Sequence, residues 1–318
     1  MQDAAPFWRR TPPAVFSPIL GLTGLAMAWL RAGEALGFGA GLGRVLLFLV
    51  LAIFLFALGA YIAKLIARPA TLVEDLRGVP GRLGLGAAML SGMLLAAGVA
   101  PFAAGPATLL LYACLAGHLG VMVLIVRVLA GLPRAERRTT PAWHLTFVGF
   151  IVAPFGAIAL GHLVLAAAIF VATVVVAMVI FGISAEQLKA KRPPAPARPL
   201  LAIHVAPLSL FATAAYLLNL GSLSVIMAIL ASLVFLALVA NLKWLLEAGF
   251  APPWAALTFP LAAYAGMLLA LGQSAAFVAW LGLAVLLVAS LVVPLIAGRI
   301  FAMWARGALA KGTGAAIA

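Results

Sequence analysis

Charged side chains are scarce in this chain. Only 8% of its 318 residues are Asp, Glu, Lys or Arg, and 66% are hydrophobic, whereas soluble domains carry about 25% charged residues. A soluble core cannot bury this much apolar surface, so the composition excludes a soluble protein. The apolar runs are about 20 residues long, which fits membrane-spanning helices and is about twice the length of a barrel strand. We therefore predict an all-α integral membrane protein.

Residues that hold metals or perform catalysis are also scarce. Cys114 is the only cysteine, which excludes an intrachain disulfide and a CxxC metal site. The histidines, His118, His144, His162 and His204, form no HxxxH pair and have no supporting carboxylate. No nucleophile, base and orienting group stand in a recognisable pattern. We predict structural histidines, no metal, no cofactor and no enzymatic activity.

The net charge of +13 does not require a nucleic-acid partner. Lys and Arg collect in the cytoplasmic loops of membrane proteins, where they also contact anionic lipid heads. Here the long basic linkers are "KLIARPATLVEDLRGVPGR", "RVLAGLPRAERRTTP" and "EQLKAKRPPAPARP". We therefore expect membrane lipids as partners and no nucleic acid.

We count ten apolar spans, which form a single transmembrane domain over residues 1–318, embedded from about 12 to 303. The predicted spans are 14–31, 43–66, 83–100, 105–128, 142–161, 163–185, 200–219, 222–246, 253–272 and 275–303. With these limits, all basic residues except Arg31 and Arg44 fall on one side of the membrane. That bias predicts a multi-pass protein of the bacterial inner membrane with both termini in the cytoplasm, which requires an even number of spans.

The odd and even spans differ in composition. Even spans such as "GRVLLFLVLAIFLFALGAYIAKLIA" are dominated by Leu, Val, Ile and Phe, whereas odd spans such as "GLGAAMLSGMLLAAG" are rich in small residues. Four odd spans carry a proline, which bends a helix: Pro18, Pro154, Pro207 and Pro260. Small residues allow close helix packing, and broken backbone must be buried in protein or face a wet cavity.

These patterns predict five helical hairpins. An inner ring of five proline-bent helices would surround a central pore, and five outer helices would face lipid. The alternative is that the prolines are packing kinks in a bundle without a pore.

The predicted inner spans have no Asp, Glu, Lys or Arg in their interiors. The polar groups available along the ring include the hydroxyls of Ser209 and Thr258, although such hydroxyls commonly bond to their own helix. A path without charged sites binds an ion weakly and favours conduction. It counts against proton-coupled transport, which uses ionisable residues at membrane depth.

Three segments resemble one family. They are "FSPILGLTGLAMAW" in the first span, "VAPLSLFATAAYL" in the seventh and "WAALTFPLAAYAG" in the ninth. With the ten-span pattern from about residue 12 to 303, they resemble the tellurite-resistance/dicarboxylate transporter (TehA) and plant slow-anion-channel family.

The resemblance implies a homotrimer with one pore per protomer, each pore closed by a phenylalanine on the ninth helix, which is Phe259 here. It also matches Phe16 on the first helix to a family phenylalanine, with Phe211 as a further pore aromatic. The sequence departs from the family in two places: Pro18 falls one position early, and Leu208-Ser209 stands where an aromatic is expected. Selectivity does not follow from these matches.

The sequence therefore predicts an anion channel or channel-like exporter of small inorganic or organic anions, with an uncharged pore and Phe259 as its gate. One alternative is a secondary transporter that exports an oxyanion or dicarboxylate such as tellurite, sulfite or malate. Another is a membrane scaffold without transport. Phe259 itself could instead be an ordinary core or lipid-facing aromatic.

Overall fold

The chain is built from helices of very different length. The computed structural model describes residues 6–133 and 137–318, so Arg134 in the second basic linker lies outside the described part. Within these ranges, nine helical segments are long and apolar enough to span a membrane. They are Pro13–Leu36 (η2, Pro13–Val15, with α1, Phe16–Leu36), α2 (Ala40–Ala67), α4 (Val79–Val99), α5 (Ala104–Gly131), α7 (Leu163–Ala190), Ala195–Leu217 (η6, Ala195–His204, with α8, Val205–Leu217), α9 (Gly221–Ala240), Pro252–Gly272 (η7, Pro252–Leu257, with α11, Thr258–Gly272) and α12 (Ala276–Ala305).

The predicted fifth span is not one continuous α-helix. It begins as a π-helix, η4 (His144–Val148), continues as a 3-10 helix, η5 (Gly149–Val152), and becomes α-helical only in α6 (Ala153–Ala159). Pro154 has no N–H, so the carbonyl of Phe150 lacks its α-helical donor. Where the sequence predicts a span over 142–161, the structure has a shorter, irregular apolar helix, His144–Ala159, which is not among the nine candidate spans of the described residues.

Burial separates the long helices into two sets. In Pro13–Leu36, α4, Ala195–Leu217 and Pro252–Gly272, between 72% and 78% of the most apolar window is buried inside the protein. In α2, α5, α7, α9 and α12 the share is only 17–28%. The predicted contrast between small-residue inner spans and aliphatic outer spans is therefore confirmed for these nine helices.

The prolines of the inner helices lie at helix starts and not in helix interiors. Pro18, Pro154, Pro207 and Pro260 are each the second or third residue of an α-helix, and a 3-10 segment leads into all four helices. Pro80 holds the same position in α4. A proline costs little in the first turn, where its missing N–H would have no helical partner. The prolines that were expected to bend the inner helices therefore lie in first turns, and Pro80 is a fifth that the sequence analysis did not single out.

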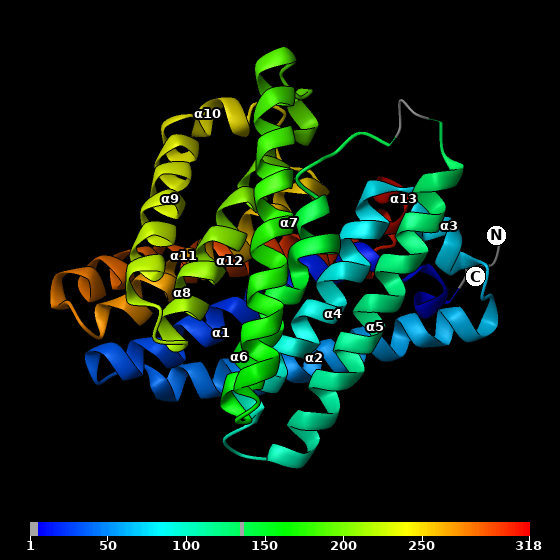
Figure 1. Cartoon of the computed structure of the whole chain (residues 1–318). Coiled ribbons are helices and arrows are strands. Elements are labelled where there is room, and N and C mark those ends of the chain that lie inside the picture. Colours follow the sequence, from blue (N-terminus) through cyan, green and yellow to red (C-terminus); the bar gives the residue numbers. More distant parts are fainter. Residues whose placement is uncertain (1–5, 134–136) are drawn as a thin grey trace.

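Neighbouring helices in the chain pack as pairs: α1 with α2, α4 with α5, α6 with α7, α8 with α9 and α11 with α12. Among the more buried helices, α1 also contacts α4 and α11, α8 contacts α6 and α11, and α4 contacts α6. Figure 1 shows α7 and α9 on the outside of this arrangement and α1, α8 and α11 within it.

One end of the bundle gathers the short elements η1 (Phe7–Arg10), α3 (Thr71–Arg77) and α13 (Ala308–Thr313). We call it the terminal end, because the two ends of the chain meet there (Figure 1): the N–H of Ala318 donates to the carbonyl of Arg9 at 3.2 Å. The opposite end, which carries the short turns within the helix pairs, is called the distal end.

Candidate functional site

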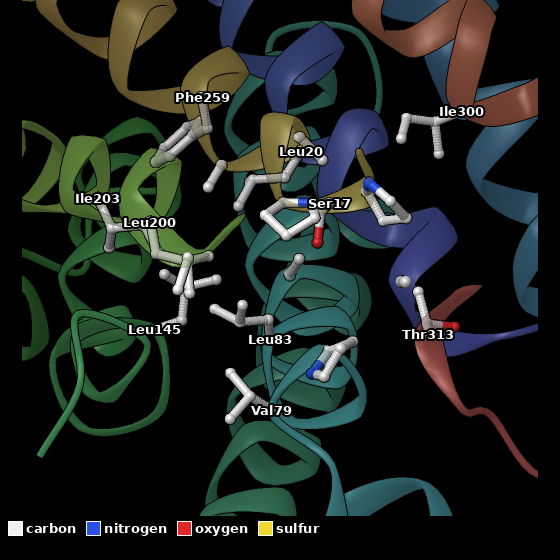
Figure 2. Close-up of a pocket in the computed structure, with 18 of the residues that line it drawn as sticks. Ser17, Leu20, Val79, Leu83, Leu145, Leu200, Ile203, Phe259, Ile300 and Thr313 are labelled. Carbon is white, nitrogen blue, oxygen red and sulfur yellow. The ribbon is translucent and has the colours of Figure 1, made fainter. Parts of the chain in front are cut away.

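A cavity of about 440 Å³ opens among the starts of the inner helices. We call it the vestibule. Its wall includes Ser17 and Leu20 of α1, Val79 and Leu83 of α4, Leu145 of η4, Leu200 and Ile203 of η6, Pro252 and Ala256 of η7, Phe259 of α11 and Thr313 of α13. Figure 2 shows these side chains converging from several helices, with Phe259 at one end and Val79 at the other. The vestibule therefore lies on the terminal side of Phe259.

The described residues of the vestibule wall include no ionisable side chain. Its polar side chains are the hydroxyls of Ser17, Thr140 and Thr313, and the rest of the wall is aliphatic, aromatic or proline. An anion that entered this cavity would meet no charged partner among these residues.

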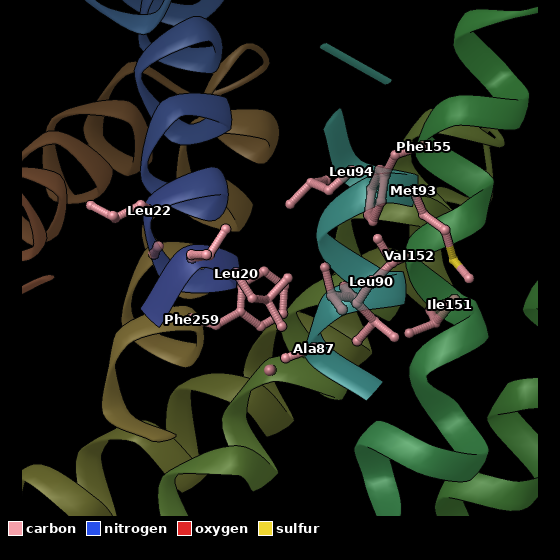
Figure 3. Close-up of a cluster of buried hydrophobic side chains, with 14 of the residues drawn as sticks. Leu20, Leu22, Ala87, Leu90, Met93, Leu94, Ile151, Val152, Phe155 and Phe259 are labelled. Atoms are coloured by element: carbon pink, nitrogen blue, oxygen red, sulfur yellow. The ribbon is translucent and has the colours of Figure 1, made fainter. Parts of the chain in front are cut away.

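Phe259 occupies the narrow side of the vestibule. Its side chain is only 7% exposed, and it also borders a second cavity of about 20 Å³, which Leu90, His144 and Leu210 help to line. The ring lies against α1, because a Cβ added to Gly24 would stand 2.9 Å from its Cδ2 atom. Figure 3 shows the ring beside Leu20, close to Ala87 of α4. One aromatic ring thus forms a wall common to a large cavity and a very small one.

Two glycines bring α1 and α11 together at this level, and the sequence analysis did not single them out. A Cβ on Gly21 would stand 2.2 Å from Oγ1 of Thr258, and a Cβ on Gly24 would contact the Phe259 ring. Gly21 and Gly24 are three residues apart and share a helix face. The signal was present as "GLTG", since small residues at such spacing allow close helix packing.

Phe16 and Phe211 lie away from the vestibule. Both are fully buried. The ring of Phe16 packs edge-on against Phe54 and Tyr61 of α2, with centroids 6.2 Å apart in each case. The ring of Phe211 packs against Phe170 of α7 at 5.8 Å. Each phenylalanine therefore joins an inner helix to an outer one.

The two predicted lining hydroxyls are bonded within their own helical segments. Ser209 Oγ donates to the carbonyl of Val205 at 2.9 Å, and Thr258 Oγ1 donates to the carbonyl of Ala255 at 2.7 Å. Neither residue lines the vestibule or the small cavity. Their role in the structure is local hydrogen bonding at helix starts.

Two histidines meet beside the small cavity. Nε2 of His144 and Nδ1 of His204 are 3.0 Å apart, and Phe181 packs against both rings. His118 of α5 lies elsewhere, against Phe150, with ring centroids 4.4 Å apart. In the part of the chain that the structure describes, no three His, Cys, Asp or Glu residues are placed to hold a metal ion.

Long apolar helices around an uncharged vestibule define a multi-pass membrane protein. Residues 10–301 match the model of the SLAC1 family, described as voltage-dependent anion channels. Because this match spans most of the chain, the chain belongs to that family and is a membrane anion channel or transporter. The resemblance to the plant slow anion channels is confirmed. No curated protein matches the chain in a sequence search.

Proposed function

We propose that the chain is an anion channel whose path runs through a closed ring of five inner helices, α1, α4, α6, α8 and α11, with the five longer helices outside. The pairwise contacts support the ring, because they lead from α1 to α4, α6, α8 and α11 and back to α1. The high burial of the inner helices supports it further. A path along the ring axis would join the vestibule to the distal end.

Phe259 is the proposed gate. The observation that carries this proposal is that its aromatic ring packs against Gly24 of α1 and borders both the vestibule and the small cavity, which Leu145, Ile203 and Ala206 also border. A hydrophobic constriction of this kind excludes water and therefore ions. Opening would require another rotamer of Phe259 or a movement of the first turn of α11.

The helix starts supply the preference for anions. Residues at or near the beginnings of α1, α4, α8 and α11 line the vestibule, namely Ala14, Val79, Ala206 and Ala256. A helix N-terminus carries a partial positive charge of about half an elementary charge. Four of them around one cavity favour anions over cations without fixing any anion tightly.

The terminal end is proposed to face the cytoplasm of a bacterium, since the basic linkers belong to that end. On this proposal the protein is a homotrimer of the inner membrane, and it is not an enzyme. A secondary transporter of dicarboxylates is less well supported, because the described residues of the vestibule wall include no charged side chain that could bind a second carboxylate.

The test is anion flux into proteoliposomes, with wild type beside Phe259→Ala and chloride and then nitrate as the anion. We expect a strong flux only in the variant, because alanine leaves the constriction open. Phe277→Ala is the matched control, since Phe277 lies on α12 and is 79% exposed toward the lipid side. If folded Phe259→Ala conducts no better than wild type, Phe259 is not the gate.

A further inference from the structure

Arg31 lies on the same face of α1 as the vestibule residues. Ser17 and Leu20 line the vestibule, Gly24 supports the Phe259 ring, and Arg31 follows Gly24 by seven residues. Positions 17, 20, 24 and 31 fall on one helix face. At a rise of about 1.5 Å per residue, Arg31 stands roughly 10 Å beyond the level of the gate, toward the distal end.

Two other inner helices approach Arg31 there. Its guanidinium carbon is 5.5 Å from the centroid of the Phe155 ring on α6. Its Cδ lies 3.7 Å from where a Cβ on Gly266 of α11 would stand, and Gly266 follows Phe259 by seven residues. Figure 3 shows Phe155 beside Leu94 of α4, and Leu94 lies farther from the Phe259 ring than Ala87 does. Arg31 is therefore surrounded by α1, α6 and α11 at a deeper level of the same axis.

The guanidinium has no acceptor of its own. The ion pairs among the described residues involve Lys64, Arg68 and Arg198, and no hydrogen bond from Arg31 to a described residue is present. Glu34, one turn later, is more than 4 Å away and accepts a bond from Gln273 at 3.2 Å. Arg31 is partly buried, and its guanidinium nitrogens are not among the fully buried ones that lack a partner. Its five N–H donors are therefore open to water or to an anion that replaces water.

We propose that Arg31 is an anion-binding site in the distal half of the path. This inference rests on the conduction axis of the proposed function. The site takes one small monovalent anion. A planar oxyanion such as nitrate matches the guanidinium fork, since two parallel N–H donors can bond two of its oxygens. Phe155 holds the guanidinium by a cation–π contact, and Gly266 leaves room for the side chain.

This inference departs from the expectation of an uncharged pore. The sequence analysis placed Arg31 at the end of the first span, on the side of the membrane opposite most basic residues. The structure shows that its side chain reaches α6 and α11. On this proposal, the described wall of the vestibule is uncharged and the distal half of the same axis contains the cation of Arg31.

The test measures nitrate binding without conduction. Purified protein in lipid nanodiscs is titrated with nitrate, replacing gluconate at constant ionic strength, while the thermal unfolding midpoint is followed. We expect Arg31→Gln to raise the half-saturating nitrate concentration about tenfold or more, because a hydrogen bond to a charged group is lost. Arg44→Gln is the matched control, since Arg44 is the exposed arginine at the start of α2, and we expect it to bind like wild type.

A second variant keeps the proposal testable if Arg31→Gln does not fold. Arg31→Lys retains the charge but loses the fork, so we expect it to bind chloride and to lose the preference for nitrate over chloride. An unchanged half-saturating concentration in Arg31→Gln, or an unchanged nitrate preference in Arg31→Lys, overturns the proposal. Because no ion flow is measured, a failed Phe259 gate would leave this result intact, and a failed Arg31 site would leave the gate intact.

Discussion

Replacing Asp75 by Asn should destabilise the terminal end of the protein strongly. The Asp75 carboxylate is fully buried and accepts from Nζ of Lys64 at 2.8 Å, from the Tyr61 hydroxyl at 3.0 Å and from the backbone N–H of Ala316 at 2.8 Å. Lys64 is equally buried, and its other acceptor is the carbonyl of Thr11 at 3.2 Å. One carboxylate thus joins α2, α3 and the C-terminal segment.

The expected loss follows from the charge that the substitution leaves behind. Asparagine keeps the volume of Asp75 but removes the counter-charge of Lys64, and a buried charge without its partner costs about 3–5 kcal/mol. With about 2.1 cal/mol/K of unfolding entropy per residue over 318 residues, this lowers the unfolding midpoint by roughly 4–8 °C. The double variant Lys64→Met with Asp75→Asn removes both charges and should recover at least half of the loss.

The assay is thermal unfolding of wild type, both single variants and the double variant in the same detergent, followed by tryptophan fluorescence. The four midpoints form a double-mutant cycle that isolates the interaction between the two side chains. If Asp75→Asn unfolds within about 1 °C of wild type, or if the double variant is no more stable than Asp75→Asn, the pair does not carry the stability that its burial implies.

Two further substitutions separate packing from gating. Phe16→Ala should lower the free energy of unfolding by roughly 3–5 kcal/mol and leave chloride flux at the wild-type level. The reason is that the Phe16 ring packs on Phe54 and Tyr61 and not in the vestibule. A stable variant with increased chloride flux would contradict this. Gly21→Leu should prevent folding, so that no monodisperse peak appears in size-exclusion chromatography, since even a Cβ there would stand 2.2 Å from Thr258. A monodisperse variant would show that α1 and α11 can separate.

Composition predicted which helices lie inside, and burial confirms it. The segment "GLGAAMLSGMLLAAG" belongs to α4, which is 78% buried over its most apolar window, whereas "GRVLLFLVLAIFLFALGAYIAKLIA" belongs to α2, which is 28% buried. Hydropathy could not show where each α-helix begins. The 3-10 segments that lead into α8 and α11 are themselves largely apolar, so the sequence did not show that their prolines stand in the first turn of each α-helix. Pro80 was missed because it precedes the predicted start of its span.

The direction of a side chain was harder to predict than the position of a helix. Inner helices are apolar on every side, so their sequence has no polar face that identifies the axis. Phe16, Phe211 and Phe259 therefore look alike in sequence, and only contacts place the first two against outer helices. Gly24 was missed for the same reason, since its role depends on which residue of α11 lies opposite it.

In the proposed path, Arg31 also acts on an ion at the gate. At roughly 10 Å and an effective dielectric constant of about 20, its charge changes the energy of a monovalent ion by about 1.7 kcal/mol. This lowers the energy of an anion beside Phe259 and raises that of a cation by the same amount, so the two differ by roughly 3 kcal/mol, or about 10²-fold in population. This adds to the preference for anions that the helix starts around the vestibule supply. An uncharged vestibule wall together with the Arg31 cation beyond the gate would select anions without a strong binding site at the constriction. Tight binding at the constriction would slow conduction.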